Sequence, residues 1–244
     1  MGVINKLQRE IAIRQINDKI ENNLEEAIVS FSFDDCPNPA FTIGASLLNK
    51  YGMKGTYYIS LGLKDDKDNS KPYFDFAHLS KIVEEGGELG SHTYNHLHFY
   101  KDDVRKIRKD LYANDVKINE LIPGYVFESF SYPYGEQSAK TKKIIREKFT
   151  SARGVKPGVN KDTIDLNNLL AVELTPELNI RKARAYVNEA IKNKGWLIFY
   201  THDIGDNPSP YGCTDYYFEA VLRYVYSKKV KTMLVKDVVK LLTK

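Results

Sequence analysis

Two adjacent carboxylates close an apolar run near the start of the chain. In "VSFSFDDCPNP", residues 29–39, apolar and polar side chains alternate as in a strand, and Asp34 and Asp35 follow directly. One carboxylate of such a pair could hold a metal while the other takes a proton as a general base. The structural alternative is a helix cap or a turn, because a proline follows two positions after Asp35.

Four of the five histidines lie in two further segments, and three of them are close together in "HTYNHLH". His92 and His96 have the spacing that puts two imidazoles on one face of a helical turn. Two histidines and one carboxylate form a common open zinc site, with positions left for water and substrate. Asp35 is the natural third ligand, whereas His98 is expected to be a loop residue beside the site. On the spacing alone, capping or solvent-exposed histidines are the alternative.

Strand-like and helix-like segments alternate along the chain, and these elements must carry the polar residues to one place. The expected strands are 27–33, 55–60, 87–92, 126–132, a short one near Ser151, 168–174, 196–202 and 230–234. The expected helices are 40–51, 74–85, 102–121, 138–149, 180–194, one from Asp215 and a last one at the end. This alternation predicts a single-domain α/β fold, a distorted (β/α) barrel of about seven parallel strands. Residues 1–26 are expected to form an N-terminal helical extension, and 27–244 the barrel domain.

Polar groups follow several of these expected strands. They are the Asp34–Asp35 pair, His92, the turn Pro133–Tyr134–Gly135, and His202. The carboxyl ends of the strands of a parallel barrel share one face, which holds the active site, so these groups are expected to converge. Two alternatives stay open: the Pro–Tyr–Gly segment could be only a turn, and His202 could be a core histidine bonded to a neighbouring loop.

These motifs, in this order, resemble those of the polysaccharide deacetylase (NodB-homology) family, carbohydrate esterase family four, whose members remove N- or O-acetyl groups from sugars. "SFDDC" at 32–36 resembles the family's first motif, T-F-D-D-G, and "HTYNH" at 92–96 resembles the second, H-[ST]-x-x-H. "SYPYG" at 131–135 partly matches the third, R-x-P-Y-G. "LIFYTH", which ends at His202, matches the fifth, a hydrophobic strand that ends in His. The resemblance spans residues 32–202.

The resemblance implies one divalent metal ion, zinc in the first place, with cobalt, nickel or manganese as alternatives. Its ligands would be Asp35, His92 and His96. Such an ion lowers the pKa of a bound water towards about 7 and polarises an acyl carbonyl. The metal chemistry expected from two histidines and a carboxylate agrees with this ligand set.

The resemblance also implies roles for the remaining polar residues. Asp34 would be the general base, and His202 would protonate the departing amine, a task suited to a side chain that can hold a proton near neutral pH. The turn at Pro133 and Tyr134 would contact the substrate, and the backbone N–H of Tyr134 would stabilise the oxyanion. Arg153 is included among the substrate and oxyanion residues as a substitute for an arginine that the third motif lacks.

Three departures from the family pattern concern residues around the metal set. Ser131 stands where the third motif has an arginine that orients the base, and Arg153, after the next short strand, is either its substitute or a surface arginine. No segment clearly matches the fourth motif, an Asp–Trp pair that supports the catalytic histidine, and Glu173 and Asp165 are both candidates for its carboxylate. Cys36 replaces the usual glycine and could be an extra ligand, an oxidation hazard or, as we prefer, inert packing. The loop after His202, "DIGDNPSPYGCT", is expected to form a wall of the pocket.

Composition excludes several other classes. With 244 residues, 42% of them hydrophobic, and a net charge of +4, the chain is an ordinary globular protein without a block of like charges, so no nucleic-acid partner is expected. Two cysteines, Cys36 and Cys213, do not make a disulfide framework. No apolar stretch has the length of a signal-peptide core or a membrane span, so a cytoplasmic protein is expected. An N-terminal helix touching a membrane surface stays as an alternative and would suit a lipid-linked substrate.

The predicted function is a metal-dependent hydrolase that removes an N-acetyl group from an aminosugar, in a cell-surface glycan or its nucleotide- or lipid-linked precursor. The basic net charge would suit a phosphate-bearing precursor. Alternatives are a deformylase of a lipid-linked aminosugar, a catalytically inactive carbohydrate-binding homologue, and a phosphodiesterase with two metals. The inactive homologue should have lost the base or a ligand, and the two-metal site needs more carboxylates and histidines than these strand ends carry.

Overall fold

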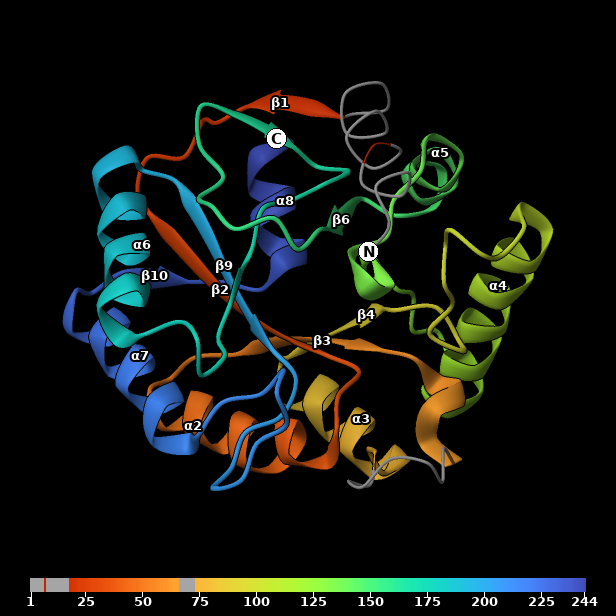
Figure 1. The fold of residues 1–244 in the computed structure, drawn as a ribbon, viewed down its shortest axis with the longest axis horizontal. Coiled ribbons are helices and arrows are strands. Elements are labelled where there is room, and N and C mark those ends of the chain that lie inside the picture. Colours follow the sequence, from red (N-terminus) through yellow and green to blue (C-terminus); the bar gives the residue numbers. More distant parts are fainter. Residues whose placement is uncertain (1–6, 8–17, 66–72) are drawn as a thin grey trace.

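One parallel sheet, curled into a half-barrel and surrounded by helices, forms the centre of the molecule (Figure 1). The computed structural model describes Leu7, residues 18–65 and residues 73–244. The strand order is β6-β5-β4-β3-β2-β9-β8, with β10 beside β2, and this architecture confirms the predicted α/β fold. The strands are β2 (Ile28–Asp34), β3 (Gly55–Ile59), β4 (Glu88–Ser91), β5 (Ser129–Ser131), β6 (Ser151–Arg153), β8 (Val172–Glu173), β9 (Trp196–Thr201) and β10 (Lys231–Thr232).

The helices begin and end within a few residues of the predicted segments. They are the π-helical turn η1 (Ala40–Gly44), α2 (Ala45–Lys50), α3 (Phe76–Glu84), α4 (Val104–Leu121), α5 (Ala139–Lys148), α6 (Ile180–Asn193), α7 (Asp215–Ser227) and α8 (Val235–Leu242), with short 3-10 turns η2 (Leu61–Asp65) and η3 (Pro133–Gly135). Asp103, Ser138 and Thr214 cap α4, α5 and α7 with their side chains, which accept the first free backbone N–H groups. Within the described part of the chain, no helix combines the length and the apolar composition that a membrane span requires.

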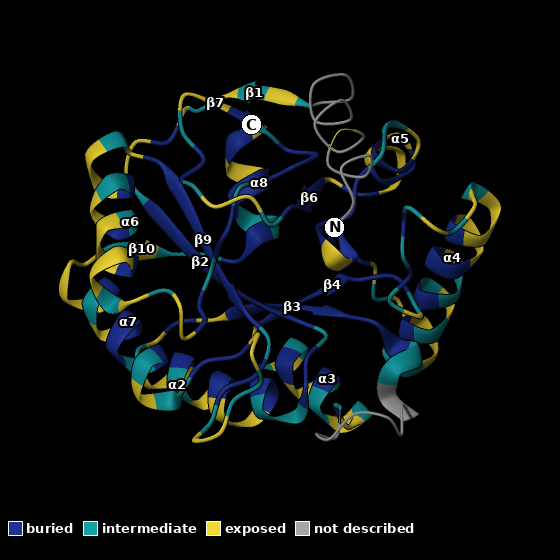
Figure 2. Ribbon diagram, in the orientation of Figure 1, coloured by how far each residue is buried: buried dark blue, intermediate teal, exposed yellow. Residues whose placement is uncertain are grey.

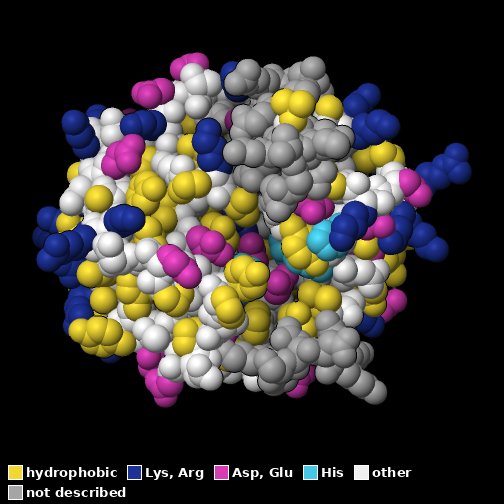
Figure 3. Space-filling model, viewed as in Figure 1, with side chains coloured by type: hydrophobic (Ala, Val, Ile, Leu, Met, Phe, Trp, Pro, Cys, Tyr) yellow, Lys and Arg dark blue, Asp and Glu magenta, His cyan; other side chains and the backbone are white. Residues whose placement is uncertain are grey.

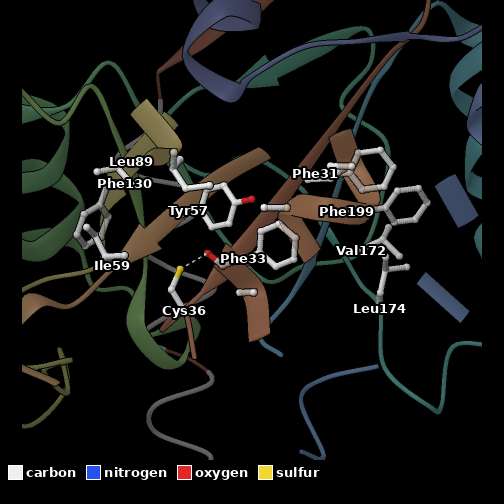
Figure 4. Close-up of a cluster of buried hydrophobic side chains, with 14 of the residues drawn as sticks. Phe31, Phe33, Cys36, Tyr57, Ile59, Leu89, Phe130, Val172, Leu174 and Phe199 are labelled. Carbon is white, nitrogen blue, oxygen red and sulfur yellow. Dashed lines mark hydrogen bonds between the residues drawn. The ribbon is translucent and has the colours of Figure 1, made fainter. Parts of the chain in front are cut away.

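The central strands are buried on both faces, as expected for a parallel sheet covered by helices (Figure 2). Every residue of β2 and β9 is buried. Phe31 stacks on Phe199 of β9 with ring centroids 5.8 Å apart, and Phe33 stacks on Tyr57 of β3 at 4.9 Å (Figure 4). Phe218 of α7 packs against both phenylalanines of β2. This packing holds β2 rigidly, and with it the carboxylates at its end.

The helical extension predicted for residues 1–26 is wrong over residues 18–26, which contain no helix. Residues 1–6 and 8–17 lie outside the described residues. Lys19–Glu21 forms a strand, β1, which pairs antiparallel with β7 (Thr163–Asp165). Leu24 is buried in the same apolar cluster as Trp196. Because β7 presents an unpaired edge, residues 19–21 can form interstrand hydrogen bonds with it. A helix at these residues would leave that edge unpaired.

Candidate active site

Asp34 and Asp35 lie at the end of β2 and line one cavity of about 410 Å³. Consecutive side chains of a strand point to opposite faces, so a regular continuation of β2 would separate the two carboxylates. Asp35 instead adopts a left-handed conformation, with a φ of 55°. This turn of the backbone brings both acids to the same cavity.

His92 and His96 come from the loop that follows β4. The loop is not the helical turn that their spacing predicts, because Thr93 and His96 have left-handed φ values of 64° and 51°. The carboxylate of Asp110, on α4, holds the loop by accepting the backbone N–H groups of residues 94 and 95 at 2.6 and 3.1 Å. The Nε2 atoms of His92 and His96 lie 3.5 and 3.3 Å from Oδ1 of Asp35. The two histidines therefore meet the aspartate as predicted, but through an irregular loop.

Charge and hydrogen bonding at this triad fit a bound cation. Burial lowers the pKa of both His92 and His96 to about 4, so both rings are neutral at neutral pH. Nδ1 of His92 donates to the carbonyl of Ser131 at 2.8 Å, which leaves the lone pair of Nε2 directed at Asp35. Oδ1 of Asp35 is buried and has no hydrogen-bond partner among the described residues. Burial also raises the pKa of Asp35, a penalty that a cation between these atoms would reverse.

The three ligand atoms lie within 4.8 Å of one another, close enough to share one ion. A set of two imidazoles and one carboxylate suits zinc or another divalent transition metal and leaves positions open. The residues present therefore fit the metal that the sequence predicts.

Arg153, the last residue of β6, forms a buried ion pair with Asp34. Its Nη2 donates to Oδ2 of Asp34 and to Oγ of Ser131, and its Nη1 donates to the carbonyl of Gly154 at 2.8 Å. Burial alone would raise the pKa of Asp34, but the guanidinium of Arg153, together with the neighbouring imidazoles, outweighs it and lowers that pKa. Arg153 thus makes with Asp34 the contact that was predicted for a substitute arginine.

The other oxygen of Asp34, Oδ1, is also buried and makes no hydrogen bond with any described residue. Asp34 is therefore an ionised carboxylate with one oxygen held by Arg153 and one oxygen without a hydrogen-bond partner among the described residues. This is the arrangement that a general base requires.

His202 follows β9 and lines the same cavity. Its Nε2 lies 3.9 Å from Oδ2 of Asp35, and its Nδ1 lies 3.1 Å from the carbonyl of Tyr211. Of the two carboxylates proposed to support it, Asp165 pairs with Lys142 at 3.1 Å and does not line the cavity. Glu173 does line the cavity, and it hydrogen-bonds the hydroxyl of Tyr200. Among the described hydrogen bonds, the partner of His202 Nδ1 is a main-chain carbonyl, which residue types could not reveal.

Tyr134 stands over the histidines. It has a left-handed φ of 56°, and its ring stacks on His98 at 3.8 Å and lies 4.3 Å from His96. His98 is bonded to Glu136 at 3.1 Å, so it supports Tyr134 as a loop residue and is outside the metal triad, as predicted. The substrate contact predicted for Pro133 is not supported, because Pro133 is buried and does not line the cavity. It begins the turn that carries Tyr134, and its fixed φ suits that position.

The side chain of Cys36 lies in the hydrophobic core beside Phe33 (Figure 4). Its Sγ lies 3.5 and 3.4 Å from the carbonyl oxygens of Phe33 and Tyr58, and burial raises the pKa of the thiol. Inert packing, the preferred interpretation, agrees with this position. Cys36 also has a left-handed φ of 54°, which explains why a glycine suits this place in the family pattern.

Residues with strained backbone conformations gather here. Eight described residues other than glycine have positive φ, and five of them belong to the site: Asp35, Cys36, Thr93, His96 and Tyr134. Such conformations each cost about 1–3 kcal/mol and cluster at functional sites, where the surrounding fold enforces them.

The cavity wall is aromatic and acidic. Its lining residues are Asp34, Asp35, His92, His96, Tyr132, Tyr134, Gly135, Val155, Glu173, Tyr200, His202 and Tyr211. Figure 3 shows histidine and acidic side chains together at the centre of this face, between hydrophobic side chains. Among the described residues, no lysine or arginine lines the cavity, so the positive net charge of the chain is not concentrated there.

The sequence and the fold both match known proteins. The family described as polysaccharide deacetylase matches residues 21–149. A peptidoglycan-N-acetylglucosamine deacetylase of Bacillus cereus is 30% identical over 94 residues, which cover 38% of this chain and 39% of that relative. The chain thus spans about two fifths of the length of the first curated relatives that it matches.

Solved structures share the fold at low sequence identity. A family 4 acetyl xylan esterase from Clostridium thermocellum, in complex with a cobalt ion, has a TM-score of 0.62 and 19% identity over 88% of this chain and 91% of that one. A family 4 carbohydrate esterase from Bacillus anthracis has a TM-score of 0.62 and 13% identity over 98% and 95% of the two chains. At these identities the likeness establishes the fold.

Proposed function

The chain belongs to the polysaccharide deacetylase family, and we propose that it is a metal-dependent hydrolase that removes an N-acetyl group from an aminosugar of a glycan. One observation carries the proposal. A single cavity holds an ionised carboxylate braced by a buried arginine, a triad of two neutral imidazoles and a carboxylate, and a further imidazole. These groups supply the three components that catalyse hydrolysis of an amide: a general base, a site for a Lewis-acidic metal and a general acid.

Asp35, His92 and His96 would hold a divalent cation. When bound, such a cation acts as a Lewis acid that makes a water more acidic and polarises the acyl carbonyl. Asp34 takes the proton of the attacking water on Oδ1, while Arg153 holds Oδ2 and fixes the direction of the base.

Two groups act on the other side of the reaction. His202 delivers a proton from Nε2 to the amine nitrogen as its bond to the acyl carbon breaks, because its Nδ1 is engaged with a carbonyl. The backbone N–H of Tyr134 is the proposed donor to the developing oxyanion. Its backbone is fixed by the left-handed turn and by the stack on His98.

The cavity favours an uncharged sugar over a phosphate-bearing precursor. Three carboxylates line it, and the described lining residues include no lysine or arginine that would pair with a diphosphate. Two exposed tyrosines, Tyr134 at 48% and Tyr211 at 62% exposure, have rings that suit the apolar faces of pyranose rings. The proposed substrate is therefore a glycan or an oligosaccharide, whereas the phosphate-bearing precursor that the net charge suggested has no support at the site.

Acetate release would test this function directly. The purified protein, treated with chelator and then with one equivalent of zinc, would be given an N-acetylated chito-oligosaccharide, a peptidoglycan fragment and a nucleotide-linked N-acetylglucosamine. We expect release from a glycan, little from the nucleotide sugar, and none from Asp34→Asn. Full activity of Asp34→Asn would contradict the assignment of the base. The predicted cytoplasmic location stays a prediction, which cell fractionation would test.

A further inference from the structure

The carbonyl oxygen of Tyr211 is a common acceptor for the end of β9. It accepts hydrogen bonds from Nδ1 of His202 at 3.1 Å and from the backbone N–H of His202 at 3.2 Å. A carbonyl can only accept, so Nδ1 of His202 carries a hydrogen in this arrangement. The lone pair or the transferable proton is therefore on Nε2, which faces the cavity.

The loop that bears Tyr211 is fixed by its own hydrogen bonds. The buried carboxylate of Asp203 accepts the backbone N–H of Ser209 at 3.0 Å and its hydroxyl at 2.5 Å. The carbonyl of Asp203 accepts the N–H of Cys213 at 3.0 Å, and Gly212 packs so closely that a Cβ on it would overlap the Asp203 carboxylate. The position of the Tyr211 carbonyl is thus determined by Asp203, the residue next to His202.

The side chain of Tyr211 belongs to the same cavity as its carbonyl. Tyr211 is 62% exposed and lines the cavity, and its ring centroid lies 5.5 Å from that of His202. An exposed aromatic ring beside the group that protonates the leaving amine is placed to contact the sugar that carries this amine. Stacking of an apolar sugar face on such a ring also excludes water from the proton transfer.

We propose that Tyr211 has two roles in this site: its carbonyl positions His202, and its ring is a stacking platform for the sugar that bears the acyl group. The second role rests on the proposed function. The first rests on the hydrogen bonds alone. In this chain a backbone group on the loop after β9 thus holds the catalytic histidine.

The stacking role is tested by binding without turnover. In the zinc-loaded Asp34→Asn protein, calorimetry would measure the Kd of an N-acetylated chito-oligosaccharide before and after replacing Tyr211. Tyr211→Ala should weaken binding about tenfold, and Tyr211→Phe should bind like the parent, because the ring face and not the hydroxyl makes the contact. Tyr216→Ala is the matched control, since Tyr216 is 77% exposed and does not line the cavity.

Equal binding by the Tyr211→Ala protein and its parent would overturn the stacking role and leave the proposed function intact. Loss of binding in Tyr211→Phe as large as in Tyr211→Ala would also overturn it. If the parent itself bound no oligosaccharide, the glycan assignment would fail, and the stacking role with it.

The positioning role is tested by moving the carbonyl without touching the ring. Gly212→Ala introduces the overlap with Asp203, whereas Gly205→Ala, in the same loop, meets only a side-chain atom of Ile43 at 3.8 Å and is the control. Nitrogen-15 NMR of the histidines should show one tautomer for His202 in the wild type and in Gly205→Ala. In Gly212→Ala that tautomer signature should be lost, and kcat should fall about 10- to 100-fold with KM little changed.

Ser209→Ala is a second variant, in case Gly212→Ala does not fold, because it removes the hydroxyl bonds to Asp203 and to the N–H of Tyr211. It should shift the same NMR signature in the same direction. An unchanged His202 tautomer and unchanged kcat in a folded variant would overturn the positioning role.

Discussion

Arg153 and Asp34 form a buried ion pair across the half-barrel, although three strands separate β6 from β2 in the sheet order. The curl of the sheet brings their ends together. The guanidinium also lies over the ring of Tyr200 at 4.2 Å, so β2, β6 and β9 all contribute to its surroundings. Arg153 is 0% exposed, and the charge of Asp34 is compensated inside the protein rather than by water.

Removal of Arg153 should therefore impair both stability and catalysis. Arg153→Met leaves a buried carboxylate without its partner, and we expect the free energy of unfolding to fall by roughly 3–5 kcal/mol. Urea denaturation measures this change. Arg108→Met is the control, because the exposed pair of Arg108 with Glu147 should contribute less than about 1 kcal/mol. Equal effects of the two substitutions would contradict the role given to Arg153.

The arginine should also be transferable to the neighbouring strand. Oγ of Ser131 lies 3.4 Å from Oδ2 of Asp34, so a guanidinium from this position can reach the base. We expect Arg153→Ser to lose deacetylase activity and the double variant Ser131→Arg, Arg153→Ser to recover part of it. Initial rates of acetate release compare the two. A double variant no more active than Arg153→Ser would show that the donor must come from β6.

Metal analysis should find one divalent ion per chain. Asp35→Ala, His92→Ala and His96→Ala each remove a ligand and should lose most of the metal. Asp34→Asn and His98→Ala should keep it, since neither residue belongs to the triad. Two ions per chain would favour the phosphodiesterase alternative, and retention of metal by the ligand variants would place the ion elsewhere.

Glu88 should make stability depend on pH. It is 1% exposed and accepts hydrogen bonds from Thr56, Ser129 and the N–H of Lys236 at 2.8, 2.5 and 3.1 Å. Burial nevertheless raises the pKa of Glu88 above its ordinary value of 4.5. The folded state therefore binds the proton more tightly than the unfolded state, so this group lowers stability as pH rises from about 4.5 through the raised pKa.

The isostere Glu88→Gln removes this dependence while it keeps an acceptor for two of the three donors. We expect the stability of Glu88→Gln relative to wild type to be higher at pH 7 than at pH 4, as measured by urea denaturation at the two pH values. A difference that is constant with pH would show that Glu88 titrates as it does in the unfolded chain.

Neither cysteine should react with a thiol reagent in the folded protein. Burial raises the pKa of Cys213 to about 12 and also raises the pKa of Cys36, so little thiolate forms at neutral pH. Both side chains are buried, so a reagent cannot reach them in the folded protein. Both should react in urea, and Tyr216→Cys provides an exposed thiol as a positive control. If removal of the metal made Cys36 reactive, Cys36 would be a ligand rather than core.

Much of the fold and the reactive residues follow from the sequence for clear physical reasons. Helical periodicity and short apolar runs locate the helices and strands to within a few residues, because the helices bury one face and the central strands are buried on both. The convergence of Asp34, His92 and His202 follows from the shared carboxyl edge of parallel strands. Arg153 could be predicted as the substitute arginine for the same reason, since it too ends a strand.

The sequence could not reveal features that depend on the backbone. The support of His202 is a carbonyl, which every residue possesses, so residue types point to the carboxylates of Glu173 and Asp165 instead. The loop between His92 and His96 has a helical spacing but left-handed residues, because Asp110 draws its N–H groups together. The strand at 19–21 exists only because an edge 142 or more residues away pairs with it.

The left-handed residues around the cavity bear on how such a protein responds to selection. At each of them, glycine would relieve conformational free energy of roughly 1 kcal/mol or more. A screen for thermal stability alone would thus favour glycine at positions 35, 96 and 134, and would discard two proposed metal ligands and the tyrosine ring as it did so. Variants selected in this way should be more stable and inactive. Their gain in the free energy of unfolding would measure how much stability the native site gives up.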